Sequence, residues 1–171
     1  MNMLQAALLT LFPAVMILAA LTDATSFTIP NRLSLILLAA FVPTVLALGR
    51  PLGEIGLDVA VGALALIAGM AMFAAGWIGG GDAKLFAVAG LWLGWPALTS
   101  FLMVTALAGG GLAVLLLNAR SAYVRTHLAG GPGWLDRLAT PGADVPYGVA
   151  IAVGALAAYP QTAMMLSFHG F

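Results

Sequence analysis

Long apolar stretches make up most of the chain, and short polar segments separate them. A helix needs about 20 apolar residues to cross a membrane, with a range of roughly 17–25. The segments that meet or approach this length are 4–21, 33–48, 57–78, 84–95, 97–117 and 145–168. This pattern predicts an all-α protein, a polytopic membrane helix bundle with six transmembrane helices, in which residues 1–171 form a single integral-membrane domain.

The uncharged stretch 85–117 is too long to be one span. A single helix of this length would measure about 50 Å, whereas the hydrocarbon core of a bilayer is roughly 30 Å thick. Pro96 follows Gly94 and Trp95, and proline blocks the continuation of a helix and disfavours helical backbone in its predecessor. We therefore predict a turn at these three residues, with one short span on each side of it.

The composition supports insertion in a membrane. Hydrophobic residues make up 63% of the chain and charged residues 7%, and the mean hydropathy is +1.09. Soluble domains carry roughly 25% charged residues, so most of this surface must face the lipid bilayer. Six basic residues balance six acidic ones, which gives no reason to expect a nucleic-acid partner. The absence of cysteine excludes disulfides, thiolate metal sites and a cysteine nucleophile.

The basic residues fix the expected orientation. With six spans, the connections 22–32, 79–84 and 118–144 fall on one side of the membrane, and only Arg50 falls on the other. The residues on the first side are Arg32, Lys84, Arg120, Arg125 and Arg137. Because Lys and Arg accumulate on the cytoplasmic side, we expect these connections to be cytoplasmic and both termini to lie on the non-cytoplasmic side. Segment 118–144 is expected to lie along the cytoplasmic interface.

Most acidic residues have an ordinary interpretation. Glu54 and Asp58 stand close to Arg50 and are interpreted as solvated loop charges. Asp136 and Asp144 belong to the long polar segment and are assigned to the surface. Ionisable groups at membrane depth are costly and usually functional, and two further aspartates fit that description better.

Asp23 and Asp82 each stand at the boundary between an apolar stretch and a polar one, and two spans separate them. They are therefore expected at the same face of the membrane. Two carboxyl groups about 3 Å apart cannot both be ionised, so they share one proton. The two groups then titrate as a unit. Such a pair can activate water and polarise a peptide carbonyl, which is the chemistry of an aspartyl protease. The hypothesis requires no covalent intermediate.

Three glycines, Gly79, Gly80 and Gly81, precede Asp82. Glycine removes side chains where a substrate backbone has to approach. The alternative stays open that the glycines end one helix and Asp82 caps the next, while Lys84 pairs with a lipid phosphate.

Three segments resemble the type IV prepilin peptidase family, which belongs to the GxGD intramembrane aspartyl proteases. The resemblance covers essentially the whole chain, and its elements occur in the family's order. Asp23 with Ile29-Pro30-Asn31 is similar to the family's Asp…Ile-Pro-Asn segment. The stretch Gly79-Gly80-Gly81-Asp82-Ala83-Lys84 resembles its GxGDxK signature, and Pro146-Tyr147-Gly148 resembles its Pro-Tyr-Gly element.

The resemblance implies that Asp23 and Asp82 are the catalytic dyad of an aspartic endopeptidase. The implied substrate is a prepilin-like protein whose basic leader is cut at the cytoplasmic boundary of the membrane, just ahead of its hydrophobic segment. The implied location is the bacterial inner membrane, with the active site facing the cytoplasm. The chain resembles the short, peptidase-only form of the Flp or tight-adherence pilus type, so we expect cleavage without N-methylation.

The remaining motif residues are expected to bind substrate or support the dyad. Asn31 is expected to cap the second helix or support Asp23, and Lys84 to tune the dyad or bind anionic lipid. The full supporting set is Gly79, Gly80, Gly81, Lys84, Pro30, Asn31, Pro146, Tyr147 and Gly148. No cofactor is expected, and no metal, because His127 and His169 are remote in sequence from each other and from an acidic cluster.

Two other classes of function stay open at this stage. A proton-coupled small membrane transporter would use the aspartates as a relay and would favour further ionisable residues in mid-span or interrupted helices in two related halves. A non-catalytic subunit of a pilus or secretion assembly would tolerate substitution of both aspartates.

Overall fold

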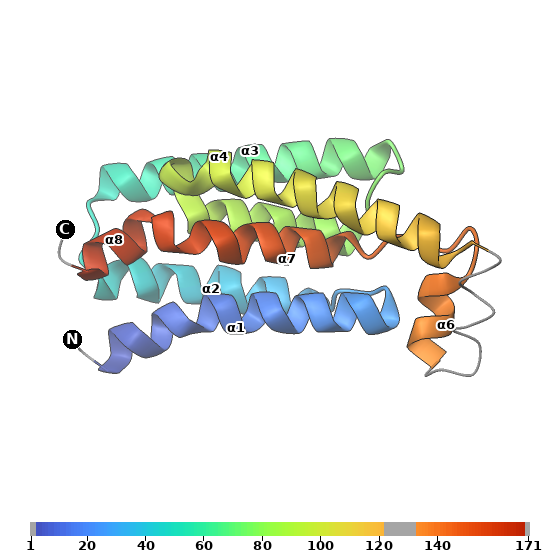
Figure 1. Cartoon of the computed structure of the whole chain (residues 1–171). Helices are drawn as coiled ribbons and strands as arrows, with labels where there is room; N and C mark the ends of the chain where they lie inside the picture. The colour runs from blue at the N-terminus through green and yellow to red at the C-terminus, as the bar shows by residue number, and fades with distance from the viewer. Residues whose placement is uncertain (1–2, 122–132, 170–171) are drawn as a thin grey trace.

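The computed structural model describes residues 3–121 and 133–169, and the regular elements in these ranges are all helical. The fold class predicted from the sequence, all-α, is thus confirmed. The elements are α1 (Met3–Ser26), α2 (Asn31–Ala47), α3 (Leu52–Ala74), α4 (Gly80–Ala119), α6 (Gly133–Ala139), α7 (Tyr147–Ala158), the 3₁₀ helix η1 (Tyr159–Gln161) and α8 (Ala163–His169). In Figure 1 the long helices lie along a common axis, and α6 lies across one end of the bundle.

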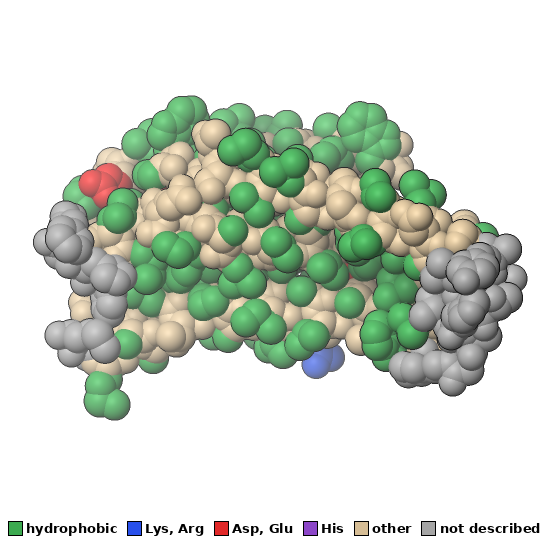
Figure 2. Space-filling model, in the orientation of Figure 1, with side chains coloured by type: hydrophobic (Ala, Val, Ile, Leu, Met, Phe, Trp, Pro, Cys, Tyr) green, Lys and Arg blue, Asp and Glu red, His purple; other side chains and the backbone are tan. Residues whose placement is uncertain are grey.

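Several helices are suited to lipid. Among the described residues α1, α3, α4 and the segment Tyr147–Leu166 are long and apolar enough to cross a membrane, and α2 is a shorter apolar helix of 17 residues. Large apolar side chains point outward along the bundle, Leu107 for example being 71% exposed. Figure 2 shows hydrophobic side chains over the whole length of one face. An apolar surface of this extent is stable in lipid and not in water, so the chain is a membrane protein.

The 40 residues of α4 contain the turn that the sequence predicts. Gly94 has a left-handed backbone, with φ 62° and ψ −171°, just ahead of Pro96, and Figure 1 shows the chain reversing direction within α4. The rings of Phe86 and Phe101 have centroids 5.2 Å apart, although 15 residues of straight helix would separate them by about 22 Å. The two halves of α4 therefore fold back against each other.

A buried ion pair lies beside this turn and corrects the interpretation of the nearby charges as solvated. Arg50 donates a hydrogen bond through Nη1 to Asp58, which is 3% exposed, and one of 3.1 Å through Nη2 to the half-exposed Glu54. Both acidic residues lie inside α3, because that helix begins at Leu52 and not at residue 57. A Cβ at Gly94 would overlap Oδ1 of Asp58. The pair thus packs directly under the turn of α4.

The first half of α4 packs tightly on α3 through small residues. A Cβ added at Gly69 of α3 would lie 3.1 Å from the backbone of Ala83, and one added at Gly90 of α4 would lie 2.8 Å from Cβ of Ala65. Small residues permit such close approach of helix backbones within a membrane. This packing fixes the position of the helical segment that begins with Asp82.

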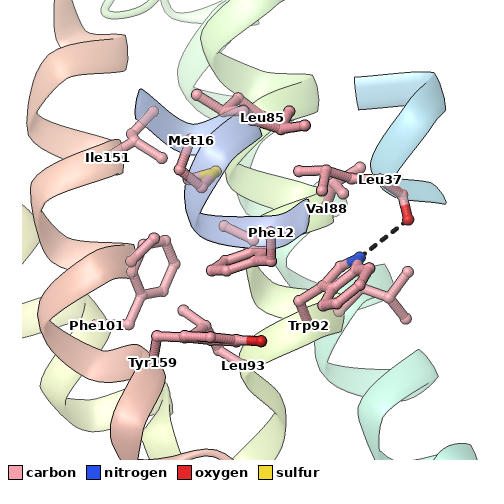
Figure 3. Packing of buried hydrophobic residues seen from close by; sticks show 14 of the residues in the cluster. Phe12, Met16, Leu37, Leu85, Val88, Trp92, Leu93, Phe101, Ile151 and Tyr159 are labelled. Carbon is pink, nitrogen blue, oxygen red and sulfur yellow. Dashed lines mark hydrogen bonds between the residues drawn. The ribbon is translucent and has the colours of Figure 1, made fainter. Parts of the chain in front are cut away.

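An aromatic cluster joins this segment to the rest of the bundle (Figure 3). The ring of Phe12 in α1 stacks on Trp92 at 5.3 Å and on Tyr159 at 4.8 Å. The indole N–H of Trp92 donates a 2.9 Å hydrogen bond to the carbonyl of Leu37 in α2, marked by the dashed line in Figure 3. The hydroxyl of Tyr159 donates one of 2.8 Å to the carbonyl of Leu9. The core therefore holds α1, α2, α4 and the C-terminal segment in one fixed arrangement.

Two further boundaries differ from the sequence prediction. The first helix does not end at residue 21 but continues through Ser26. The last apolar segment, predicted as 145–168, is interrupted by η1, which contains Pro160. Proline removes a backbone donor and clashes with the preceding turn of an α-helix, which accounts for the interruption.

Candidate functional site

Asp23 and Asp82 lie at the same end of the bundle. Asp23 belongs to the last turn of α1, and Asp82 to the first turn of α4. Figure 1 shows the end of α1 and the start of α4 at the end where α6 lies. Both side chains are buried, with exposures of 4% and 8%, and Ile29 packs against the glycine beside each of them, at Gly148 for Asp23 and at Gly81 for Asp82. The structure thus brings together the two acids that the sequence singles out.

The N-terminus of α7 faces both carboxyl groups. The backbone N–H of Gly148, the second residue of α7, donates a 2.7 Å hydrogen bond to Oδ2 of Asp23 and also interacts with Asp82. The first N–H groups of a helix have no acceptor within the helix, and they carry the positive end of its dipole. The start of α7 therefore compensates negative charge on the pair.

No side chain fits at Gly148. A Cβ there would lie 2.8 Å from Oδ2 of Asp23 and 2.5 Å from Cδ1 of Ile29. The glycine allows the backbone of α7 to reach the carboxylate directly. Pro146 precedes it as the N-cap residue of α7, and Tyr147 is the first helical residue, so the Pro-Tyr-Gly element forms one wall of the site.

Asp82 has one engaged oxygen and one free oxygen. The backbone N–H of Gly79 donates a 2.9 Å hydrogen bond to Oδ2 of Asp82, which is the capping contact that the sequence left open as an alternative. Oδ1 is buried and accepts no hydrogen bond within the described part of the chain. Leaving a buried carboxylate oxygen unpaired is costly. Helix capping therefore accounts for the burial of Oδ2 but not for that of Oδ1.

The loop between α1 and α2 is attached to the start of α4. A Cβ at Gly81 would lie 3.1 Å from Cβ of Ile29, so the glycine permits close contact at this point. Pro30 is the N-cap residue of α2, with φ −60° and ψ 132°. Nζ of Lys84 donates a 2.9 Å hydrogen bond to Oδ1 of Asn31. The Ile-Pro-Asn and GxGDxK segments therefore form one contiguous structure beside the dyad.

Arg120, the C-cap residue of α4, does more than add positive charge to this end of the bundle. Its guanidinium donates hydrogen bonds of 3.0 Å to the carbonyl of Leu138 and 2.8 Å to that of Asp144. It thereby holds the segment that leads into α7. Its place at the junction of an apolar stretch and a polar segment is the only sequence signal for this role.

Of the two histidines, only His169 belongs to the part of the chain that the structure describes. His169 belongs to α8, at the opposite end of the bundle in Figure 1, and His127 lies outside the described residues, as does Arg125. Over residues 3–121 and 133–169 the structure holds no group of three or more His, Cys, Asp or Glu side chains suited to a metal ion. The reactive groups of the site are the two buried carboxyl groups, which can share a proton and transfer it to or from a bound water.

Comparison with known proteins gives one match. A family model, described as the type IV leader peptidase family, matches residues 10–114. The matched range holds both aspartates and the segments joined at Lys84, and it ends before α7. No curated protein and no solved structure matches the chain significantly.

Proposed function

The chain belongs to the type IV leader peptidase family, and from this premise we propose that it is an intramembrane aspartyl endopeptidase with Asp23 and Asp82 as its catalytic pair. The observation that carries the proposal is the meeting of these two buried acids at the N-terminus of α7, through the 2.7 Å hydrogen bond from Gly148 to Asp23. The proposed substrate is a prepilin-like protein of the type IV or Flp class with a cleavable basic leader.

In the proposed mechanism the pair holds one proton between its two carboxyl groups. The ionised group accepts a proton from water, whose oxygen attacks the scissile carbonyl carbon. The protonated group donates its proton to the carbonyl oxygen. The tetrahedral intermediate then returns one hydroxyl proton to the pair as the C–N bond breaks, and the leaving amine takes up a proton from the pair, which again holds one proton. Neither aspartate is given a permanent role, because the pair titrates as a unit.

The proposed topology places the dyad at the cytoplasmic side of the bacterial inner membrane. The end of the bundle that carries the dyad also carries Arg32 and Lys84, near the N-termini of α2 and α4, and Arg137 of α6, whereas Arg50 lies at the opposite end, beside the turn of α4. This distribution follows the positive-inside rule. The arrangement supports six membrane crossings, counting the two halves of α4 separately, with both termini on the non-cytoplasmic side.

The transporter alternative is not favoured. The buried acids lie in two separate groups, the dyad and Asp58 with its partner Arg50. The aromatic cluster of Phe12, Trp92 and Tyr159 lies between these two groups along the bundle, because Trp92 follows Asp82 by ten residues of α4 and precedes Gly94 at the turn. A relay across the membrane needs a chain of ionisable groups, and none bridges this cluster in the described structure.

The purified protein, reconstituted in liposomes with a Flp-type prepilin, tests the proposal. We expect loss of the leader, with a new N-terminus at the start of the hydrophobic segment, read by mass spectrometry, and no added N-methyl group. Recovery of intact prepilin from wild-type liposomes would reject the proposed activity on this substrate class.

A further inference from the structure

A cavity of about 460 Å³ lies between α3, α4 and α7 and opens to the outer surface of the bundle. Its outer edge includes Trp77 and Leu102, which are 70% and 44% exposed. Among its lining residues are Ile78, Phe86, Ala106, Gly110, Tyr147 and Ile151. In a membrane, such an opening faces the lipid, so a helix within the bilayer can enter from the side.

The cavity begins next to the dyad. Phe86 follows Asp82 by four residues, which places the two side chains on the same face of α4. Ile78 directly precedes the capping residue Gly79, and Tyr147 directly precedes Gly148. Whatever occupies the cavity therefore has one end about one helical turn along α4 from Asp82 and beside the residue that precedes Gly148, the hydrogen-bond partner of Asp23.

The cavity also runs away from the dyad toward the middle of the bundle. Along the second half of α4 its lining extends from Ala113 to Leu102, a distance of about 16 Å at 1.5 Å per residue. This is roughly half the thickness of the hydrocarbon core. The cavity thus has the position and length to hold the first turns of a helix that starts at the dyad.

The glycines of α4 at this level are not required by the packing of the chain itself. No described atom lies within 4 Å of the Cβ that a side chain would add at Gly110 or at Gly111. Glycine destabilises a helix relative to alanine. An exposed glycine in a membrane helix instead allows the backbone of another helix to come close, and Gly110 lies on the wall of the cavity.

We propose that this cavity receives the apolar helix of the substrate, the segment that follows the scissile bond. The inference rests on the proposed peptidase function and adds to it the surface that binds the substrate within the membrane. The helix of a prepilin-like substrate begins where its leader is cut, so a helix seated here would present its first residues to Asp23 and Asp82.

A second, larger cavity of about 860 Å³ lies between α2, α3 and the first half of α4. It is lined by Lys84, which follows Asp82 by two residues and so points to nearly the opposite side of α4. The larger cavity therefore lies on the other side of α4 from Asp82 and supplies a control.

The first test measures leader removal by variants in liposomes. Gly110→Leu fills the proposed binding surface and is expected to slow cleavage about tenfold, corresponding to 1.4 kcal/mol of lost binding free energy. Gly111→Leu changes the neighbouring residue of the same helix, and Ala63→Leu fills the larger cavity. Both controls are expected to stay within about twofold of the wild type. Equal rates for Gly110→Leu and Gly111→Leu would overturn the inference while leaving the peptidase activity established.

The second test is photocrosslinking in the Asp23→Asn background, so that bound prepilin is not consumed. A photoreactive residue at Ala106, inside the proposed surface, is expected to crosslink to the substrate helix, and one at Ala63 is not. Crosslinking from Ala63 alone, between two copies of this chain, or to lipid alone would each overturn the inference. If the wild-type protein cleaves no prepilin, the proposed function fails and this inference fails with it, an outcome distinct from cleavage without crosslinking at Ala106.

Discussion

The backbone N–H of Gly148 donates a 2.7 Å hydrogen bond to the carboxylate of Asp23, a residue 125 positions earlier in the chain. The contact joins the last turn of α1 to the first turn of α7. It also brings the start of α7 next to Asp82. A helix N-terminus is a favourable partner for negative charge, so this contact links the fold directly to the charge that the pair must carry.

Replacing Gly148 by alanine should abolish most activity without preventing insertion. The added Cβ would lie 2.8 Å from Oδ2 of Asp23, so the carboxylate or α7 has to move. Displacements of this size in a catalytic group cost about 100-fold in rate. Leader cleavage in liposomes measures the loss, and Gly133→Ala, where an added Cβ meets no described atom within 4 Å, is the matched control. Wild-type activity in Gly148→Ala would contradict the proposed role of this contact.

Asp23→Asn and Asp82→Asn should each remove cleavage, because an amide can neither accept nor donate the shared proton. General acid–base groups contribute about 10²–10⁴-fold to rate, so each single variant is expected to lose at least 100-fold. The double variant should be no worse than either single variant, since the pair acts as one unit. Glu54→Gln, which changes a half-exposed carboxylate at the other end of the bundle, is the control and should cleave normally.

Asp58→Ala should destabilise the fold. It leaves Arg50 buried without its principal counter-ion, and breaking a buried pair costs about 3–5 kcal/mol. The loss should appear as a lower midpoint of thermal unfolding in detergent. Replacing both residues, as in Arg50→Met with Asp58→Leu, should recover much of it. Equal midpoints for Asp58→Ala and Glu54→Ala would contradict the buried pair, because Glu54 is half-exposed and contributes little.

Arg120→Ala should loosen the approach to α7. The change removes the donors to the carbonyls of Leu138 and Asp144, and amide hydrogens between residues 138 and 148 should then exchange faster. We expect cleavage to fall severalfold, because Gly148 is less well held. Arg137→Ala, in the same region, serves for comparison. Unchanged exchange in Arg120→Ala would show that this segment is held by other contacts.

The features predicted correctly from the sequence are those that follow from local rules. The length of the stretch 85–117 and the proline at its centre predicted the turn at Gly94. The spacing of Asp23 and Asp82 by two apolar stretches predicted that both lie at one end of the bundle, where the structure places them. These inferences need only helix geometry and the thickness of a bilayer.

The interactions that the sequence did not predict depend on packing between distant segments. Hydropathy treats Asp58 as a polar residue near a loop, but its burial is stable only because Arg50 folds back onto α3 and Gly94 packs against it. Asp23 follows the apolar stretch, yet α1 continues past it to Ser26, and the carboxylate is buried because it accepts a hydrogen bond from the start of α7. Neither partner can be identified from the spacing of residues along the chain.

The aromatic and glycine contacts of α4 also fix its first half at one end, so that the number of residues in this half sets the position of Asp82. Twelve residues separate Asp82 from Gly94, a rise of about 18 Å, and the far end is anchored at Asp58 and at the Trp92–Leu37 hydrogen bond. One inserted residue between these points would shift Asp82 by about 1.5 Å and swing it by roughly 100° about the helix axis, away from Asp23. The depth of Asp82 in the membrane and the direction of its side chain therefore depend on the number of residues between Asp82 and the turn at the opposite end of the bundle.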